Sequence, residues 1–244
     1  MRLVAERAAI PYAAILVLGA LGGSTPRRCA LPSASRTAST AEYLESTPTE
    51  RPMKSHREME SGTSNADAST LAAIAPATIK RAFTEMMDEE AQHVVFFENA
   101  LRQAGASPRP KPTFTGLAQS DQRSFATMSR TLENAGVRAF LLAIGAISDE
   151  KYVAAAASIA TIEARHAGFV NALFGKPLSE DGAFDKPASH QEIIKAVSPF
   201  IESLNGGPDP AETFADDTAI LNFALLLEHL EAEFYEINVP TLFH

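Results

Sequence analysis

The fold is decided by one stretch of the chain, Thr161-Ile162-Glu163-Ala164-Arg165-His166-Ala167. Glu163 and His166 lie three residues apart, which is about 300° of helical rotation, so their side chains project from one face. The same face places apolar residues at alternating steps of four and three, the pattern of a helix buried in a bundle: Tyr152, Ala156, Ile159, Val170 and Leu173. A carboxylate and an imidazole are costly to bury unless something pairs with them. A divalent metal ion is a partner that suits both.

Composition limits the other possibilities. The chain has 244 residues and a formal net charge of -9, which argues against nucleic acid as its main partner. There is no Trp, and the second half is rich in Ala, Leu, Glu and Ile without sustained strand alternation, so an all-α fold is expected. Cys29 is the single cysteine, which excludes an intrachain disulfide and a thiolate cluster. Any metal ligands must therefore be carboxylates and imidazoles.

The chain divides into three parts. Residues 1–23 combine a basic start, a short apolar run and small residues spaced like a cleavage site. They predict an export signal and an extracytoplasmic or secreted protein, with a buried or anchoring helix as the alternative. Residues 24–68 are rich in Ser, Thr, Pro and charged residues, and are interpreted as a disordered tether. Residues 69–244 are expected to form a helical bundle.

Three long helical segments come first in the bundle. The first has an apolar seam that ends before Gly105: Ile79, Phe83, Met86, Glu90, His93, Phe97 and Leu101. The proline-rich connection that follows suits a crossover along the bundle. The second helix is predicted over 121–148, with a seam of Ala126, Ser129, Glu133, Gly136, Phe140 and Ile144. A short turn at 148–150 then joins it antiparallel to the helix that contains Glu163.

A shorter helix and a fourth long helix complete the prediction. The shorter helix is expected over 189–204, and Ser189 with Glu192 forms a capping box at its start. The last helix is expected to begin near Asp216 and to stop at Pro240. Its seam contains Leu221, Ala224, Glu228, Glu231 and Tyr235.

Each of the four long helices therefore places an acidic residue in its apolar seam, and two of them add a His three residues later. The set is Glu90, His93, Glu133, Glu163, His166 and Glu228. Two metal ions need about this many protein ligands, with positions left for water or oxygen species. A lone buried His is more often a hydrogen-bonded core residue, and a lone seam Glu is more often a helix-edge residue that reaches water. Either alternative explains one helix, but neither readily explains four.

Four stretches give the chain a family resemblance: residues 90–93, residues 132–137, residues 163–167 and, most distinctively, residues 221–235. Over about residues 70–240 the sequence resembles the ferritin-like superfamily of dinuclear carboxylate proteins. Within it, the sequence is similar to the branch of plant desiccation-related and fungal stress-response proteins. The resemblance implies a ferritin-like four-helix bundle with two Fe or Mn ions.

The resemblance also implies a role for each ligand. Glu90 and Glu163 would bridge the two metals, with Glu133 and Glu228 as terminal ligands and His93 and His166 capping one metal each. Tyr235 would lie near the site, where many ferritin-like bundles hold a tyrosine. Glu231 is interpreted as a variable ligand or a helix-edge residue, and the helix-edge interpretation is preferred.

The order of the helices departs from the family. The helix of Glu228 resembles the family's first helix but comes last here, which indicates a circularly permuted bundle. The long connection before it allows closure within one chain, which is favoured. It also permits exchange of the helix in a homodimer, or a truncated tandem. Closure predicts that Glu228 lies beside Glu90 and His93 of the same chain.

The function favoured by the sequence is redox chemistry on oxygen or peroxide in a stress or desiccation setting, with the question of catalysis left open. The alternative is a non-enzymatic protective or structural bundle, with a structural metal site or none. Mineral iron storage is a third interpretation, which would need a cage of many subunits.

Overall fold

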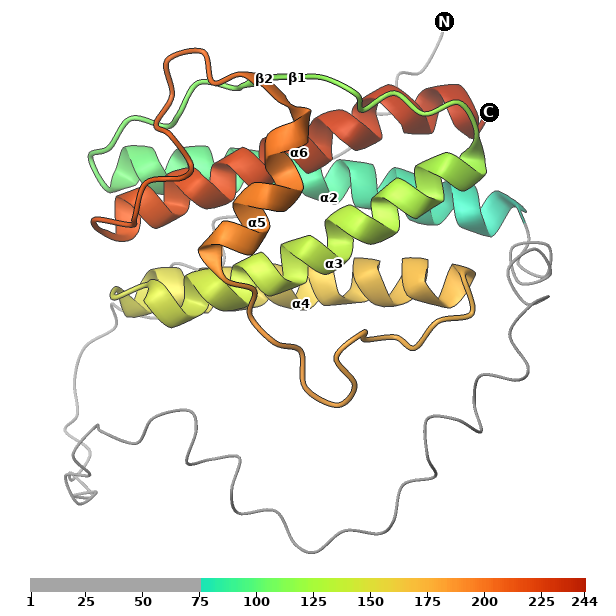
Figure 1. Ribbon diagram of the computed structural model, residues 1–244, viewed down its shortest axis with the longest axis horizontal. Helices are drawn as coiled ribbons and strands as arrows, with labels where there is room; N and C mark the ends of the chain where they lie inside the picture. Colours follow the sequence, from blue (N-terminus) through green and yellow to red (C-terminus); the bar gives the residue numbers. More distant parts are fainter. Residues whose placement is uncertain (1–75) are drawn as a thin grey trace, which may run out of the picture. The chain divides into compact units, whose positions relative to one another are not determined.

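The computed structural model describes residues 76–244, which form a helical bundle (Figure 1). The long helices are α2 (Pro76–Gln103), α3 (Gln122–Ala146), α4 (Glu150–Leu173) and α6 (Asp217–Leu242). The shorter helix is α5 (His190–Val197). The predicted all-α class is confirmed, whereas the predicted signal at 1–23 and tether at 24–68 lie outside the described residues. No helix within residues 76–244 is both long and apolar enough to span a bilayer.

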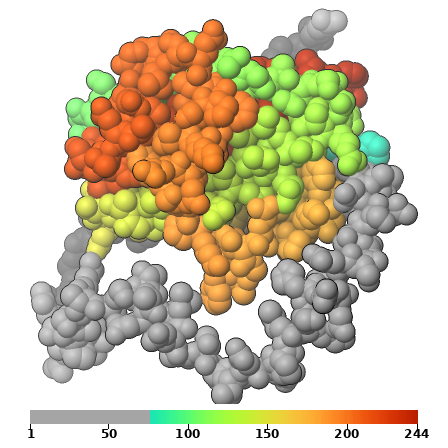
Figure 2. All heavy atoms as spheres, viewed as in Figure 1, coloured from blue at the N-terminus to red at the C-terminus, as the bar shows by residue number. Residues whose placement is uncertain are grey.

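The long helices pack as two pairs. α2 lies along α6 and α3 lies along α4, and α3 also contacts α6 (Figure 1). The last helix therefore fills the fourth position of the bundle from within the same chain. α5 crosses α3, and Figure 2 shows that the segment between α4 and α6 covers part of this face of the bundle, where much of α3 remains uncovered.

The predicted crossover between α2 and α3 runs along α6 and is attached to it at both ends. The backbone N–H of Arg109 donates to Asn222 Oδ1 at 2.7 Å, and the buried Arg109 guanidinium donates to the Asn222 carbonyl at 3.3 Å. At the other end, the N–H of Gln119 donates to Asn238 Oδ1 at 2.7 Å. Two asparagines of α6 thus hold the connection in place, which satisfies backbone groups that a buried loop would otherwise leave unpaired.

Capping residues set the starts of the helices. Asp121 caps α3 in a capping box with Ser124, and Asp149 caps α4 directly after the short turn that makes the two helices antiparallel. Ser189 and Glu192 form the predicted capping box of α5. Asp216 accepts a hydrogen bond from the N–H of Ala219 at the start of α6. These side chains satisfy amide groups that have no partner within the helix.

The structure corrects three local predictions. α5 ends at Val197, not at Leu204, and continues as a short 3₁₀ turn (Ser198–Phe200). The chain then forms strand β2 (Ile201–Ser203), which pairs antiparallel with β1 (Thr113–Phe114) in a ribbon that was not predicted.

The third correction concerns Pro240, which lies inside α6, since the helix continues to Leu242. Proline lacks the N–H that would bond to the carbonyl of Glu236, one turn earlier. Glu236 is exposed, so water can satisfy that carbonyl and the helix tolerates the proline.

Two apolar clusters fill the bundle, one on each side of its middle. The larger contains Phe83, Phe125, Leu173 and Phe234, and the smaller contains Phe97, Phe140, Ile159 and Leu225. Along α2 and α4, the buried residues Glu90 and Glu163 separate the residues of one cluster from those of the other. The candidate site is this buried polar layer.

Candidate metal centre

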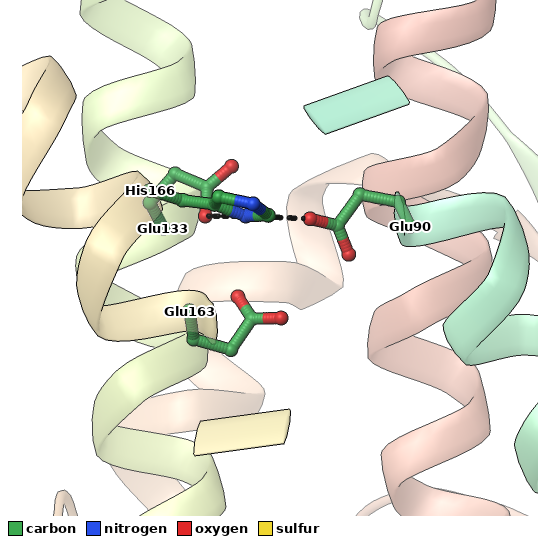
Figure 3. Close-up of side chains that lie close together, drawn as sticks. All are labelled: Glu90, Glu133, Glu163 and His166. Carbon is green, nitrogen blue, oxygen red and sulfur yellow. Dashed lines mark ion pairs between the residues drawn. The ribbon is translucent and has the colours of Figure 1, made fainter. Parts of the chain in front are cut away.

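Six buried polar side chains meet in the polar layer, and they are the six that the sequence predicted as ligands. α2 provides Glu90 and His93, α3 provides Glu133, α4 provides Glu163 and His166, and α6 provides Glu228. The four glutamates are all 0 % exposed. Figure 3 shows Glu90 pointing across the bundle toward Glu133, Glu163 and His166 on the opposite pair of helices.

The six side chains form two overlapping groups whose ligand atoms all lie within 4.8 Å of one another. The first group is Glu90, Glu133, Glu163 and His166, and the second is Glu90, His93, Glu163 and Glu228. Glu90 and Glu163 belong to both groups. This is the same division that the family resemblance implies, with two shared carboxylates and one carboxylate and one imidazole on each side.

Both imidazoles turn Nδ1 toward the carboxylates. His93 Nδ1 lies 3.1 Å from Glu90 Oε2 and 3.2 Å from Glu228 Oε2. His166 Nδ1 lies 2.9 Å from Glu90 Oε1 and 3.3 Å from Glu133 Oε2. Glu228 therefore lies beside His93 of the same chain, as closure of the bundle by α6 predicts.

Most of the carboxylate oxygens in this layer have no hydrogen-bond partner within residues 76–244. Both oxygens of Glu163 and Glu228 are unpaired, as are Glu90 Oε1 and Glu133 Oε2. Some lie near an imidazole nitrogen, but without the angles of a hydrogen bond. Buried polar groups that remain unpaired are costly, and carboxylates most of all. Cations bound between these oxygens and the two Nδ1 atoms would remove that cost, so the residues fit a metal centre.

The electrostatics of the layer show how strongly the glutamates affect one another. Burial raises the pKa of Glu228 to about 8, and burial together with the charge of Glu90 raises the pKa of Glu163 well above its usual range. Burial also acts on Glu90, but His166 and His93 outweigh it and lower the pKa of Glu90 to about 2. Without a metal, the layer therefore retains protons that metal binding would release.

The two imidazoles retain protons for a related reason. Burial alone would lower the pKa of His166. The charge of Glu133, together with the contacts that the imidazole makes with Glu133 and Glu90, raises the pKa of His166 to about 12. The pKa of His93 is likewise raised above its usual range, because Glu228 and Glu163 outweigh the effect of burial.

Glu89 is a residue of the site that the sequence analysis missed. His166 Nε2 donates a hydrogen bond to Glu89 Oε2 at 2.7 Å, so the imidazole is held between Glu89 on one side and the buried glutamates on the other. Glu89 is on α2, one residue before Glu90, and its side chain is 32 % exposed. The acidic pair Glu89-Glu90 was the signal in the sequence that could have indicated it. Adjacent helical residues point about 100° apart, so Glu89 lies beside the seam of α2 and not within it.

Tyr235 lies in the site as the resemblance implied. Its hydroxyl donates a hydrogen bond to Glu133 Oε1 and lies 2.7 Å from the hydroxyl of Ser129. Ser129 was expected only as a seam residue. The tyrosine leaves Glu133 Oε2 facing the centre.

The preferred interpretation of Glu231 as a helix-edge residue is wrong. Its side chain does not reach water, because the residue is only 3 % exposed, and Glu231 Oε2 has no hydrogen-bond partner within residues 76–244. A Cβ at Gly136 would lie 2.9 Å from Glu163 Oε2 and 3.2 Å from Glu231 Oε1. Glycine at this position of α3 therefore leaves room for both carboxylates, although Glu231 belongs to neither four-residue group.

The comparison with protein families agrees with this geometry. Residues 35–176, more than half of the chain, match the model of a ferritin-like domain. The chain belongs to this family. The match covers α2, α3 and α4 of the ferritin-like bundle and ends before α6, which provides Glu228. It begins within the segment interpreted as a tether, outside the described residues. No curated protein matches the chain.

Proposed function

We propose that this ferritin-like protein binds two iron or manganese ions between its two pairs of helices. Glu90 and Glu163 would bind both ions. Glu133 and His166 would complete one position, and His93 and Glu228 would complete the other; the two are referred to below as the Glu133 position and the Glu228 position. The observation that supports this proposal most strongly is the pair of buried four-residue groups with two shared carboxylates.

The chemistry of the donors favours these metals. Carboxylate oxygens and imidazole nitrogens suit iron and manganese, and the absence of Cys or Met from the two groups argues against soft metals. Four carboxylates also provide the negative charge that two divalent cations neutralise. When bound, the ions would supply a redox centre for oxygen or peroxide. The chain itself contributes the buried ligands, the apolar clusters that exclude water, and Tyr235, which orients Glu133.

Elemental analysis of protein reconstituted with iron or manganese tests the proposed binding. Glu163→Gln should reduce the bound metal, because both positions lose an anionic ligand while the size of the side chain is kept. Asp88→Asn is the matched control, since Asp88 is an exposed acid on α2 and belongs to neither group. Wild-type protein that binds neither metal would contradict the proposal.

The redox part needs a separate test. Loaded wild-type protein should oxidise ferrous iron or decompose peroxide faster than Glu133→Ala, which lacks a ligand at one position. If metal binds but neither rate exceeds that of the variant, the alternative of a structural metal site is correct. The stress or desiccation setting is supported only by the sequence resemblance.

We also propose that the helix order is a circular permutation of the family order. Residues 221–235 resemble the family's first helix, and α6 packs along α2, which would be the second. Phe243, directly after α6, has its ring 5.2 Å from that of Phe83 in the second turn of α2. The end of α6 thus lies where a short loop could join it to α2. Moving residues 214–244 to precede Pro76 through a flexible linker should preserve metal binding, and loss of binding in a folded protein would contradict the permutation.

A further inference from the structure

The two proposed metal positions differ in how their ligands are held from outside the centre. At the Glu133 position, the two ligands that are not shared with the other position, Glu133 and His166, each form a hydrogen bond to a residue outside the two groups. Tyr235 donates to Glu133 Oε1, so that Oε2 faces the centre. His166 Nε2 donates to Glu89, which leaves Nδ1 directed at Glu90 and Glu133. Each ligand is therefore fixed in orientation before any ion arrives.

The Glu228 position lacks both kinds of support within the part of the chain that the structure describes. Neither oxygen of Glu228 has a hydrogen-bond partner. The polar contacts of His93 all involve Nδ1, which faces the centre, and none involves Nε2. Both ligands of this position interact with the other ligands only, so their orientation is set by the centre itself.

The sequence explains this difference. Glu89 precedes Glu90 in the first Glu-x-x-His segment, but Ile162 precedes Glu163 in the second, so α4 offers no carboxylate at the equivalent place. Tyr235 comes seven residues after Glu228 on α6. The residue seven after Glu133 on α3 is Phe140, which is buried in the smaller apolar cluster with Leu225 and has no hydroxyl. Ile162 and Phe140 cannot accept or donate a side-chain hydrogen bond as Glu89 and Tyr235 do. The Glu228 position therefore lacks both outer hydrogen bonds.

We propose that the two metal positions are unequal, with the Glu133 position binding its ion more tightly and the Glu228 position exchanging its ion more easily. This inference rests on the proposed function. Outer hydrogen bonds that orient a metal ligand typically change metal affinity by about 10- to 100-fold. Glu89 and Tyr235 are positioning residues in this account, because they act through His166 and Glu133. With limiting metal, the protein holds one ion, at the Glu133 position.

Titration of the metal-free full chain with Mn²⁺ tests the inference, with unbound Mn²⁺ followed by electron paramagnetic resonance. Wild-type protein should bind two ions in two steps, with dissociation constants about 10- to 100-fold apart. Glu89→Ala and Tyr235→Phe should each weaken the first step and leave the second nearly unchanged. Glu89→Gln should weaken it less than Glu89→Ala, because glutamine still offers an acceptor to His166 Nε2. His93→Ala should remove only the second step.

Asp88→Asn is the matched control and should change neither step. Folding of each variant is checked by circular dichroism. If Tyr235→Phe is destabilised, Glu89→Ala and Glu89→Gln decide whether the two positions differ, because the Glu89 side chain is partly exposed and its replacement should not disturb the core. Two ions bound by wild-type protein with equal constants, or an effect of Glu89→Ala on the second step alone, would overturn this inference while the proposed function stands. Wild-type protein that binds no Mn²⁺ or iron would overturn the proposed function as well.

Discussion

The larger apolar cluster and the buried polar layer lie side by side on the same four helices, yet they contribute to the stability of the fold in different ways. In the apolar cluster, Phe125 stacks on Phe234 with ring centroids 5.1 Å apart and meets Phe83 edge-on at 4.8 Å. In the polar layer, Glu163 and Glu228 have no hydrogen-bond partner for either oxygen within residues 76–244. The first region stabilises the fold by itself, whereas the second does so only when cations or protons are present.

The largest expected effect is in the apolar cluster. Phe125→Ala removes a ring that is 0 % exposed, and should lower the free energy of unfolding by about 3–5 kcal/mol. The loss should be nearly the same with and without metal, because Phe125 is not itself a proposed ligand, although its ring packs edge-on against that of Tyr235. Urea unfolding of both forms measures it. A loss seen only in the loaded protein would mean that the two regions are not independent.

Metal should stabilise the polar layer by a smaller amount. An ion that binds only the folded protein, present at 100 times its dissociation constant, adds about 2.7 kcal/mol to the free energy of unfolding. Urea unfolding with Mn²⁺ and with a chelator compares the two forms, and Glu163→Gln serves as the control because it should lose most of the difference. Equal midpoints for loaded and metal-free wild-type protein would show that this layer needs no cation.

Stability of the metal-free protein should fall as pH rises from about 5 to 8. Glu228 has a folded pKa of about 8, above its ordinary value of 4.5, so the folded state binds more protons than the unfolded state in this window. The raised pKa values of Glu163, His93 and His166 act in the same direction. Each such proton changes stability by up to about 1.4 kcal/mol per pH unit. Unfolding midpoints across the window measure the slope, which should be much smaller in the loaded protein.

Two glycines of α3 give the smallest and most local comparison. Nothing lies within 4 Å of a Cβ built at Gly145, so Gly145→Ala should stabilise the helix by up to about 1 kcal/mol. At Gly136 the added Cβ would lie 2.9 Å from Glu163 Oε2. Gly136→Ala should therefore gain less stability than Gly145→Ala and bind less metal. Unchanged metal content in Gly136→Ala would show that Glu163 can move away without consequence.

The sequence predicted what depends on helical periodicity. The seams of α2 and α4 place Glu90 and Glu163 at buried positions, whereas the residues one step before and after each of them are only partly buried. The division of the six proposed ligands into two groups came from the family resemblance, and the two groups found in the structure have the same members. These features follow from spacing along single helices and from the need to bury each seam.

Other features depend on neighbours that spacing does not reveal. Glu231 was placed at a helix edge, but α6 is covered by the crossover as well as by α2 and α3, so few of its residues reach water. Glu89 was missed because it lies off the seam of α2, and only the position of α4 brings His166 against it. The β1–β2 ribbon is too short to produce a sequence period.

Anomalous X-ray diffraction from crystals grown with Mn²⁺ is the most direct test of the central claim. Two peaks are predicted in the polar layer, each beside both Glu90 and Glu163, with one near Glu133 and His166 and the other near His93 and Glu228. At limiting Mn²⁺, the peak near Glu133 should be the stronger. A polar layer without anomalous signal at saturating Mn²⁺ and iron, or a peak bound by other residues, would contradict the account.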